Sequence, residues 1–209
     1  MNIPVDIHTH RLPEVPGEAI VNCYPETYVP QDGGWYSVGV HPWHVQRDTR
    51  LELLAELVDH PQVLAVGEAG LDKLADAPMP VQLEFFRHQA LLAMKMDKPL
   101  IIHLVKAADE LLQLKQTLQP ANSWIMHGFR GKAALAQEYL RHGFYLSFGG
   151  KYQEEALRIV PSGRLFIETD ESMTPITELY ERAACVRGVS RNEFQEMVQQ
   201  NIRSVFFRL

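Results

Sequence analysis

Short apolar segments alternate along this chain with longer amphipathic segments. Seven segments with a helical period of apolar residues follow the third and later apolar runs, and predict helices at Thr49–His60, Pro80–Met96, Lys106–Leu118, Lys132–Arg141, Tyr152–Ile159, Pro175–Arg187 and Arg191–Phe206. Eight shorter runs rich in β-branched and aromatic residues predict strands at Ile3–His8, Ala19–Tyr24, Trp35–Val40, Val63–Gly67, Leu100–Leu104, Ser123–His127, Phe144–Phe148 and Leu165–Thr169. This alternation is typical of βαβ units and of a parallel sheet.

The first two connections between predicted strands have no room for a helix. Residues 11–18 and 25–34 are rich in proline and glycine, which favour loops. Eight strands in order favour a TIM-type (β/α)8 barrel, trimmed, with helices missing between the first three strands, over an open doubly wound sheet. The length of 209 residues lies near the lower limit for such a barrel, about 200 residues. We expect a single domain over residues 1–209.

The composition agrees with a folded chain and narrows its partners. Hydrophobic residues make up 46% and charged residues 22%, which argues against disorder. The net charge of −6 argues against a basic coat for long nucleic acid, although it leaves room for a local basic rim. With no signal-peptide pattern and no membrane-length apolar run, the expected location is cytoplasmic, away from membranes. Cys23 and Cys185 are expected to be buried free thiols.

The first predicted strand ends in the pattern Asp6-Ile7-His8-Thr9-His10. Alternate side chains of a strand share a face, so His8 and His10 are placed to reach one ion. Zinc, manganese and similar ions accept neutral imidazole. Asp6 lies on the same face and is expected to orient an imidazole. By itself the pattern is weak evidence for a metal site, because two histidines in a polar turn are the commoner case.

Four more polar residues end later strands, and they strengthen the case for a metal site. Glu68, His127 and Asp170 each terminate an apolar run, and His103 lies near the end of another. The carboxyl ends of all the strands of a barrel converge on one mouth, where active sites lie. Four imidazoles and two carboxylates exceed the needs of one tetrahedral ion. They suit two divalent ions about 3.5–4 Å apart that share a carboxylate, an arrangement that acidifies water and stabilises a phosphoryl displacement.

The loops after these strands carry cations and aromatic residues. A basic rim around a divalent centre would favour a phosphorylated substrate, although cations in loops are often simply solvated; the candidates are Arg11, Lys73, Lys106, Arg130, Lys132 and Lys151. Four aromatic residues near the mouth are candidates for stacking on bases, with core packing expected for at least half of them: Trp43, Phe129, Phe148 and Tyr152.

Together these motifs resemble the TatD-type metal-dependent hydrolases of the amidohydrolase superfamily. The similarity covers the first strand and the chain from about residue 35 onward, and its motifs are Asp6–His10, Gly39–Pro42, Gly67–Asp72, Gln82–Gln89, Pro99–His103, His127–Gly131, Tyr145–Gly149, Glu168–Asp170 and the closing helix that begins at Ser190. The resemblance implies a TIM-type barrel and a dinuclear site. It implies that one ion is held by His8, His10 and Asp170.

The resemblance also implies the remaining roles. His103 and His127 would hold the second ion, and Glu68 would bridge the two. The implied activity is metal-dependent hydrolysis of phosphodiester bonds of DNA, with Asp170 and Glu68 as the catalytic residues and Asp170 as the base for the attacking water. The implied partner is DNA or a small phosphorylated substrate, with no obligate protein partner, and a monomer is the expected state.

The sequence departs from the family pattern near the substrate. The family usually has a polar Ser-Arg-Asp-Ala run after its third metal-binding strand, where this chain has Leu104–Ala107. Lys106 would then replace a substrate-facing arginine, and Arg130 would contact phosphate. His41 ends the third strand and is expected to support a metal ligand or contact substrate, or else to cap the turn before Pro42. Two alternatives follow: a related hydrolase for a small-molecule amide or phosphate ester, and a non-catalytic binding protein.

Overall fold

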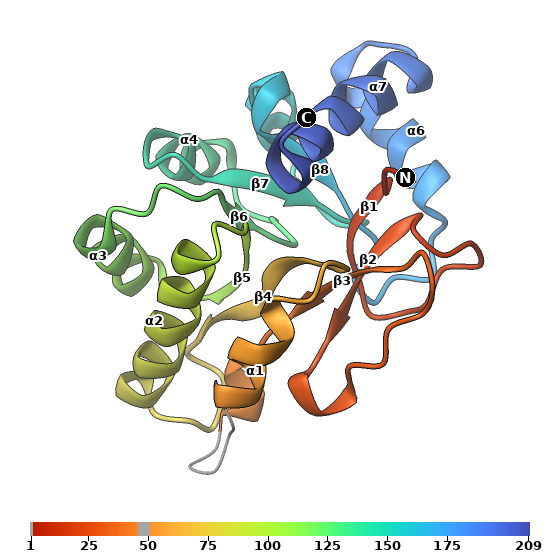
Figure 1. Ribbon diagram of the computed structural model, residues 1–209. Coiled ribbons are helices and arrows are strands. Elements are labelled where there is room, and N and C mark those ends of the chain that lie inside the picture. The colour runs from red at the N-terminus through yellow and green to blue at the C-terminus, as the bar shows by residue number, and fades with distance from the viewer. Residues whose placement is uncertain (1, 46–50) are drawn as a thin grey trace.

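A computed structural model, which describes residues 2–45 and 51–209, contains an eight-stranded parallel sheet in the order β1-β2-β3-β4-β5-β6-β7-β8 (Figure 1). The strands are β1 (Asp6–Thr9), β2 (Ala19–Cys23), β3 (Trp35–Val38), β4 (Val63–Asp72), β5 (Leu100–Val105), β6 (Trp124–Met126), β7 (Tyr145–Phe148) and β8 (Leu165–Ile167). The ring closes where Thr9 bridges to Asp170 and the Asp170 N–H donates to the His8 carbonyl at 2.9 Å. All eight predicted strands and the barrel are confirmed, but the predicted end of the fourth strand at Gly67 is wrong, because β4 continues through Glu68 to Asp72.

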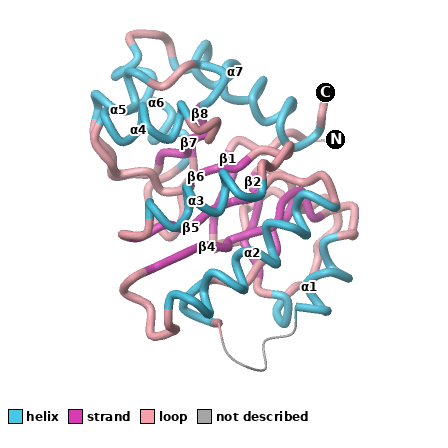
Figure 2. The backbone as a smooth tube through the Cα atoms, turned by 90° about the vertical axis from the view of Figure 1, so that its left-hand side faces the viewer, coloured by secondary structure: helices cyan, strands magenta, loops and turns pink. Residues whose placement is uncertain are grey.

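The helices lie outside the sheet (Figures 1 and 2). They are α1 (Leu51–Val58), α2 (Met79–Lys95), α3 (Ala108–Leu118), α4 (Ala133–Arg141), α5 (Glu154–Ile159), α6 (Ile176–Arg187) and α7 (Arg191–Ile202), in agreement with the predicted segments. The predicted start of the first helix at Thr49 lies outside the described residues. Helix α7 begins with a capping box, in which Ser190 and Glu193 satisfy each other's backbone N–H groups, and it continues as a π-helical turn over Arg203–Phe207.

The first two connections contain no α-helix in the described structure, as predicted. The only helical turn between β2 and β3 is a 3-10 turn at Pro25–Thr27. Aromatic side chains from other parts of the chain pack on the first strands, where outer helices are missing. Phe207 of the C-terminal π-turn packs against Trp35 with ring centroids 5.3 Å apart, and Tyr28 packs against Tyr36 at 5.3 Å. The chain therefore forms a barrel near the lower limit of length because its C-terminus and a loop replace outer helices.

Asp6 joins the two strands that close the barrel. Its Oδ1 accepts hydrogen bonds from the backbone N–H groups of His8 (3.2 Å) and Thr169 (3.0 Å), and its Oδ2 accepts one from the Thr169 hydroxyl (2.6 Å). The expectation that Asp6 orients an imidazole is therefore wrong, because all these bonds go to β1 and to the segment after β8. Burial raises the pKa of Asp6 to about 7, against the opposing effect of the Thr169 hydrogen bonds.

The structure also tests the predictions for the two cysteines and for membrane-spanning segments. Cys185 is exposed on α6 and Cys23 is half-buried, so the expectation of buried thiols is wrong for Cys185. The periodicity of α6 buries Ala183 and Ala184 and leaves Cys185 on the exposed face. Among the described residues, no helix is long and apolar enough to cross a membrane.

Lys115 on α3 gives a pH-dependent prediction for stability. Its Nζ lies 4.8 Å from the ring centroids of both Trp124 and Phe144, and burial, with a smaller effect of Arg164, lowers its pKa to about 8. Between about pH 8 and the ordinary pKa of about 10.4, the unfolded chain binds this proton and the folded chain does not, so stability rises with pH. In Lys115→Met that rise is expected to be missing, and below pH 8 the variant is expected to exceed the wild type in stability by about 1 kcal/mol, because water still screens the partly exposed ammonium.

Urea denaturation of both proteins from pH 7 to 10.5 measures the effect. Lys95→Met is the matched control, since Lys95 is an exposed lysine at the end of α2. A stability difference between Lys115→Met and wild type that does not change with pH would contradict the prediction.

Candidate metal centre

The site begins at the end of β1. His8 is completely buried and His10 is partly exposed, and their ring centroids lie 5.2 Å apart. Neither His8 nitrogen has a hydrogen-bond partner among the described residues. A buried imidazole without a partner is unfavourable, so this side chain is set up for a ligand that the protein does not itself provide.

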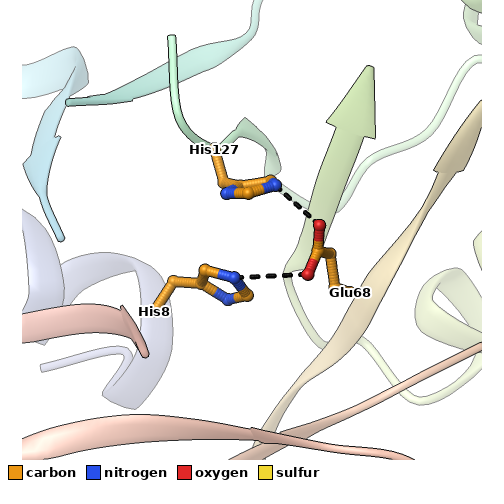
Figure 3. Close-up of side chains that lie close together, drawn as sticks. All are labelled: His8, Glu68 and His127. Atoms are coloured by element: carbon orange, nitrogen blue, oxygen red, sulfur yellow. Dashed lines mark ion pairs between the residues drawn. The ribbon is translucent and has the colours of Figure 1, made fainter. Parts of the chain in front are cut away.

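Glu68 on β4 lies at the centre of a ring of histidines. All ten positions of β4 are buried, and the Glu68 N–H donates to the Asn22 side chain at 2.6 Å, which fixes the backbone. Figure 3 shows the imidazoles of His8 and His127 directed at the two carboxylate oxygens of Glu68. Five imidazole nitrogens surround this carboxylate, at 2.8 Å for His127, 2.9 Å for His103, 3.3 Å for His10, 3.4 Å for His8 and 3.4 Å for His41.

Asp170 completes this ring from the far side of the barrel seam. Its Oδ1 lies 3.7 Å from His10 Nε2 and 3.8 Å from His8 Nε2. Its φ of 56° is in the left-handed region, which asparagine and aspartate tolerate better than most residues. The backbone pairing with β1 holds this turn, so the same contacts that close the barrel also bring Asp170 to the histidine pair.

Two further carboxylates lie behind the histidines. Asp72 Oδ2 is 3.1 Å from His103 Nε2 and accepts a hydrogen bond from Trp43 Nε1 at 2.6 Å. Glu168 Oε1 is 3.1 Å from His127 Nδ1 and accepts from the Gly128 N–H at 2.7 Å. Carboxylates in this position fix the tautomer of a metal-binding histidine. Asp72 was not predicted as a site residue, although its even spacing from Glu68 on one strand was a usable signal.

A glycine between these two carboxylates makes the arrangement possible. A Cβ atom at Gly70 would lie 1.8 Å from the His103 carbonyl oxygen, so only glycine fits where β4 approaches β5. The close approach aligns Gly70 with His103 in the parallel register. His103 consequently lies between Glu68 and Asp72, with one ring nitrogen near each carboxylate.

His41 lies inside the cluster rather than at its rim. Its Nε2 faces Glu68, its ring centroid is 4.2 Å from that of His103, and its Nδ1 accepts from the Trp43 N–H at 3.1 Å. Candidate ligand atoms lie within 4.8 Å of one another in four overlapping groups, which are His8–Glu68–His127, His8–His10–Asp170, His41–Glu68–His103 and His127–Glu168–Asp170. The structure thus brings together all six residues for which metal binding was predicted and adds His41 and Glu168.

The charges in the cluster depend strongly on one another. Burial alone would raise the pKa of Glu68, but His127, His10 and His103 outweigh it and hold that pKa well below its usual value. Burial alone would lower the pKa of His127, but Glu68 and Glu168 raise it well above its usual value. The Glu68 hydrogen bond likewise raises the pKa of His10, whereas burial lowers that of His41. The carboxylates therefore attract positive charge to this site.

The donor set fits divalent cations. Imidazole nitrogen and carboxylate oxygen suit zinc, manganese and related ions. Neither nitrogen of buried His8 makes a hydrogen bond among the described residues, although its Nε2 lies 3.4 Å from Glu68, and a bound cation would give it a ligand bond. A cation must displace protons that the carboxylates otherwise attract to the imidazoles.

A cavity of about 580 Å³ opens over the cluster. His10, His41, Arg130 and Asp170 line it, whereas Lys106 does not. Lys106 is an exposed residue with a φ of 56°, so the structure does not bring this predicted substrate contact to the cavity. Leu104 and Val105, which follow His103, form an apolar part of the cavity wall.

The predicted aromatic and basic rim divides into two classes. Trp43 is 63% exposed at the mouth, whereas Phe129 and Phe148 are buried in the core and Tyr152 packs on Phe148. Lys73 pairs with Glu110 at 2.7 Å, and Arg11 bonds to the Ser172 carbonyl. Within residues 2–45 and 51–209, no ion pair engages the remaining rim cations, which are Lys106, Arg130, Lys132 and Lys151.

Comparison with known proteins agrees with this geometry. A family model described as TatD related DNase matches residues 26–207. A relative from Bacillus subtilis, the uncharacterized metal-dependent hydrolase YabD, is 39% identical over 145 residues, which cover 64% of this chain and 57% of the relative. The chain thus matches just over half of the length of that relative. The 3'-5' ssDNA/RNA exonuclease TatD of Enterobacter lignolyticus is 28% identical over 82% of this chain and 77% of its own length.

The fold has close counterparts among solved structures. A TatD homologue from Escherichia coli superimposes with a TM-score of 0.81 at 20% identity, over 98% of this chain and 99% of the other. A TatD-family hydrolase from Entamoeba histolytica superimposes with a TM-score of 0.77 at 17% identity, over 100% and 99%. At these identities the likeness establishes the barrel and no more.

Proposed function

We propose, from the premise that this chain belongs to the TatD-related DNase family, that it is a divalent-metal-dependent hydrolase of phosphodiester bonds in nucleic acid. One observation carries the proposal: five imidazole nitrogens lie within 3.4 Å of the Glu68 carboxylate, with Asp170 beside two of them. The relative from Enterobacter lignolyticus is named an exonuclease for single-stranded DNA and RNA, which supports nucleic acid as the substrate.

The ligand sets follow the predicted division. His8, His10 and Asp170 would hold one cation, His103 and His127 a second, and Glu68 both. One donor group, His8–His10–Asp170, matches the first set. His103 and His127 each share a group with Glu68 but not with each other, and His41 lies next to His103. When bound, the cations would polarise the phosphoryl oxygens and acidify water.

The chain's own groups supply the remaining parts of the reaction. Asp170 lies at the mouth with a quarter of its side chain exposed, so its carboxylate can orient a water molecule and accept its proton. Arg130 lines the cavity without an ion-pair partner among the described residues, and its planar guanidinium suits two oxygens of one phosphate. Asp72 and Glu168 hold His103 and His127 in one orientation.

The direct test is an activity panel on the purified protein. Single-stranded DNA, bis(p-nitrophenyl) phosphate and a series of small amides are incubated with chelator-treated protein, with and without added manganese or magnesium. We expect metal-dependent cleavage of the phosphodiesters. Cleavage of amides alone would overturn the proposal, and failure of the protein to take up any divalent metal would overturn its metal dependence.

A second candidate function is hydrolysis of a small-molecule amide or phosphate ester. The observation that favours it is the apolar pair Leu104 and Val105 in the cavity wall, where the family's polar run would face substrate. Cleavage of bis(p-nitrophenyl) phosphate, the small ester of the panel, without cleavage of single-stranded DNA would identify this function.

Asp72 gives a prediction for metal affinity. In Asp72→Ala, His103 loses the carboxylate that fixes its ring, and Trp43 loses its acceptor. We expect metal affinity to fall by about 10–100-fold, as for other residues that support metal-binding histidines. Titration calorimetry with manganese measures the change. Asp76→Ala, in the loop that follows β4, is the matched control, and equal affinity in the two variants would contradict the prediction.

A further inference from the structure

The two sides of the mouth differ in their chemistry. The loops after β2 and β3 bring Tyr24 and Trp43 to the cavity over the cluster. The loops after β6 and β7 bring Arg130 and Lys151 to the mouth. Strands β3 and β7 stand four places apart in a ring of eight, so the aromatic side and the cationic side face each other across the site.

Trp43 is both exposed and held in place. Its side chain is 63% exposed, yet its Nε1 donates to Asp72 at 2.6 Å and its backbone N–H donates to His41 at 3.1 Å. These bonds fix one edge of the indole and leave its surface at the mouth. A rigid, exposed aromatic ring loses little conformational entropy when a flat ligand stacks on it.

A second cavity of about 480 Å³ lies on the cationic side. It shares Gly128, Arg130, Asp170 and Glu171 with the first cavity, so the two are adjacent, and Gly149, Gly150 and Lys151 line it further. The two glycines leave the backbone uncovered by side chains, as close approach of a phosphate requires.

The charge balance of this second cavity favours an anion. Its third cation, Arg182, is paired with Glu178, whereas Arg130 and Lys151 have no ion-pair partner in the part of the chain that the structure describes. Of its carboxylates, Glu168 faces His127 and Asp170 faces the histidine pair. Glu171 is left to oppose two free cations.

We propose that one single strand of nucleic acid crosses the mouth, with a base stacked on Trp43 and the adjoining sugar–phosphate backbone in the second cavity against Arg130 and Lys151. The inference rests on the proposed function and specifies which part of the strand each side holds. A base must be unpaired to stack on a side chain, which selects a single strand over a duplex. The net charge of −6 agrees, since a duplex is bound mainly by many phosphate contacts.

Stacking is tested with a nine-nucleotide strand, in which phosphorothioate linkages slow cleavage. Fluorescence anisotropy measures the Kd of this strand for the metal-loaded enzyme. Trp43→Ala is expected to weaken binding by about 5–100-fold. Trp43→Phe is expected to weaken it much less, because phenylalanine keeps an aromatic ring for stacking. Both variants lose the N–H donor to Asp72. A series of strands is then used, each with one abasic site at a different position. The loss of affinity caused by Trp43→Ala should disappear for only one of these strands, the one that lacks the stacked base. Metal content is measured for each variant.

The backbone contact is tested by salt dependence. Lys151→Gln is expected to weaken binding several-fold at low salt, to reduce the slope of log Kd against log salt by about 0.7, and to matter less as the strand is shortened to a dinucleotide. Lys95→Gln is the control, because Lys95 is likewise an exposed lysine without an ion pair among the described residues. It should leave both quantities at their wild-type values.

Three results would overturn the inference. The first is equal loss in Trp43→Ala and Trp43→Phe at every abasic position, which would mean that Trp43 acts only through Asp72. The second is identical behaviour of Lys151→Gln and Lys95→Gln. The third is wild-type enzyme that hydrolyses bis(p-nitrophenyl) phosphate with manganese but binds the strand no better than a dinucleotide, which would leave the proposed hydrolase intact. Wild-type enzyme that does neither would overturn both.

Discussion

Glu68→Ala is expected to abolish turnover while the barrel stays folded. Five imidazole nitrogens face this carboxylate, and removing it takes away the group that both proposed ligand sets share. The loss should exceed the about 10–100-fold that follows from removing a residue that only supports a ligand. We expect kcat/KM for a phosphodiester to fall by about 1,000-fold or more, together with the metal content.

The fold should tolerate this change, because the backbone of Glu68 is held by Asn22 and by the pairing of β4 with its neighbours. In Glu68→Ala, one of the two carboxylates that raise the pKa of His127 is absent. The pKa of His127 is then lower, so its imidazole can remain neutral in the buried site. Circular dichroism and urea denaturation report the fold. Glu196→Ala, at an exposed position on α7, is the control. Activity of Glu68→Ala near that of the wild type would refute the proposed site.

Asp170→Asn is expected to lower turnover by about 10²–10⁴-fold, the range for loss of a general base. Asparagine has nearly the same shape and tolerates the φ of 56°, so the variant removes charge and proton affinity without adding backbone strain. Metal content should fall less than in Glu68→Ala, because His8 and His10 remain. Steady-state kinetics and elemental analysis measure the two effects.

A matched control exists for this substitution. Asp97 also has a left-handed backbone, with a φ of 50°, and lies on the surface, where it pairs with Arg208. Asp97→Asn makes the same chemical change in the same conformation outside the mouth, and we expect normal kinetics. If Asp170→Asn and Asp97→Asn turn over substrate equally well, Asp170 is not the base.

The sequence alone predicted the barrel and the members of the cluster for one physical reason. In a parallel barrel the carboxyl ends of all strands meet at one mouth, so a polar residue that ends an apolar run is located without knowledge of distances. His8, Glu68, His127 and Asp170 each end a run predicted from the sequence, and His103 lies near the end of another. The structure places these residues together, with Glu68 and His103 inside the longer strands β4 and β5. The proline-rich and glycine-rich connections likewise showed where outer helices are missing.

The pairing of side chains could not be predicted, because it depends on how neighbouring strands are aligned and how the ring closes. Asp72 lies behind His103 because glycine at position 70 lets β4 and β5 approach. Asp6 binds Thr169 rather than an imidazole because closure brings the end of β8 beside β1.

Which charged residues reach the mouth was also decided by tertiary structure. Lys106 and Arg130 both follow a strand end, yet of the two only Arg130 lines the cavity. The direction of each side chain depends on the backbone conformation of its loop, and Lys106 has a φ of 56°. The alternation of apolar and polar residues thus determined the strands, their order and the rim on which the chemistry gathers. Strand register and closure of the ring decided which atoms face each other there, since those distances depend on residues far apart in the chain.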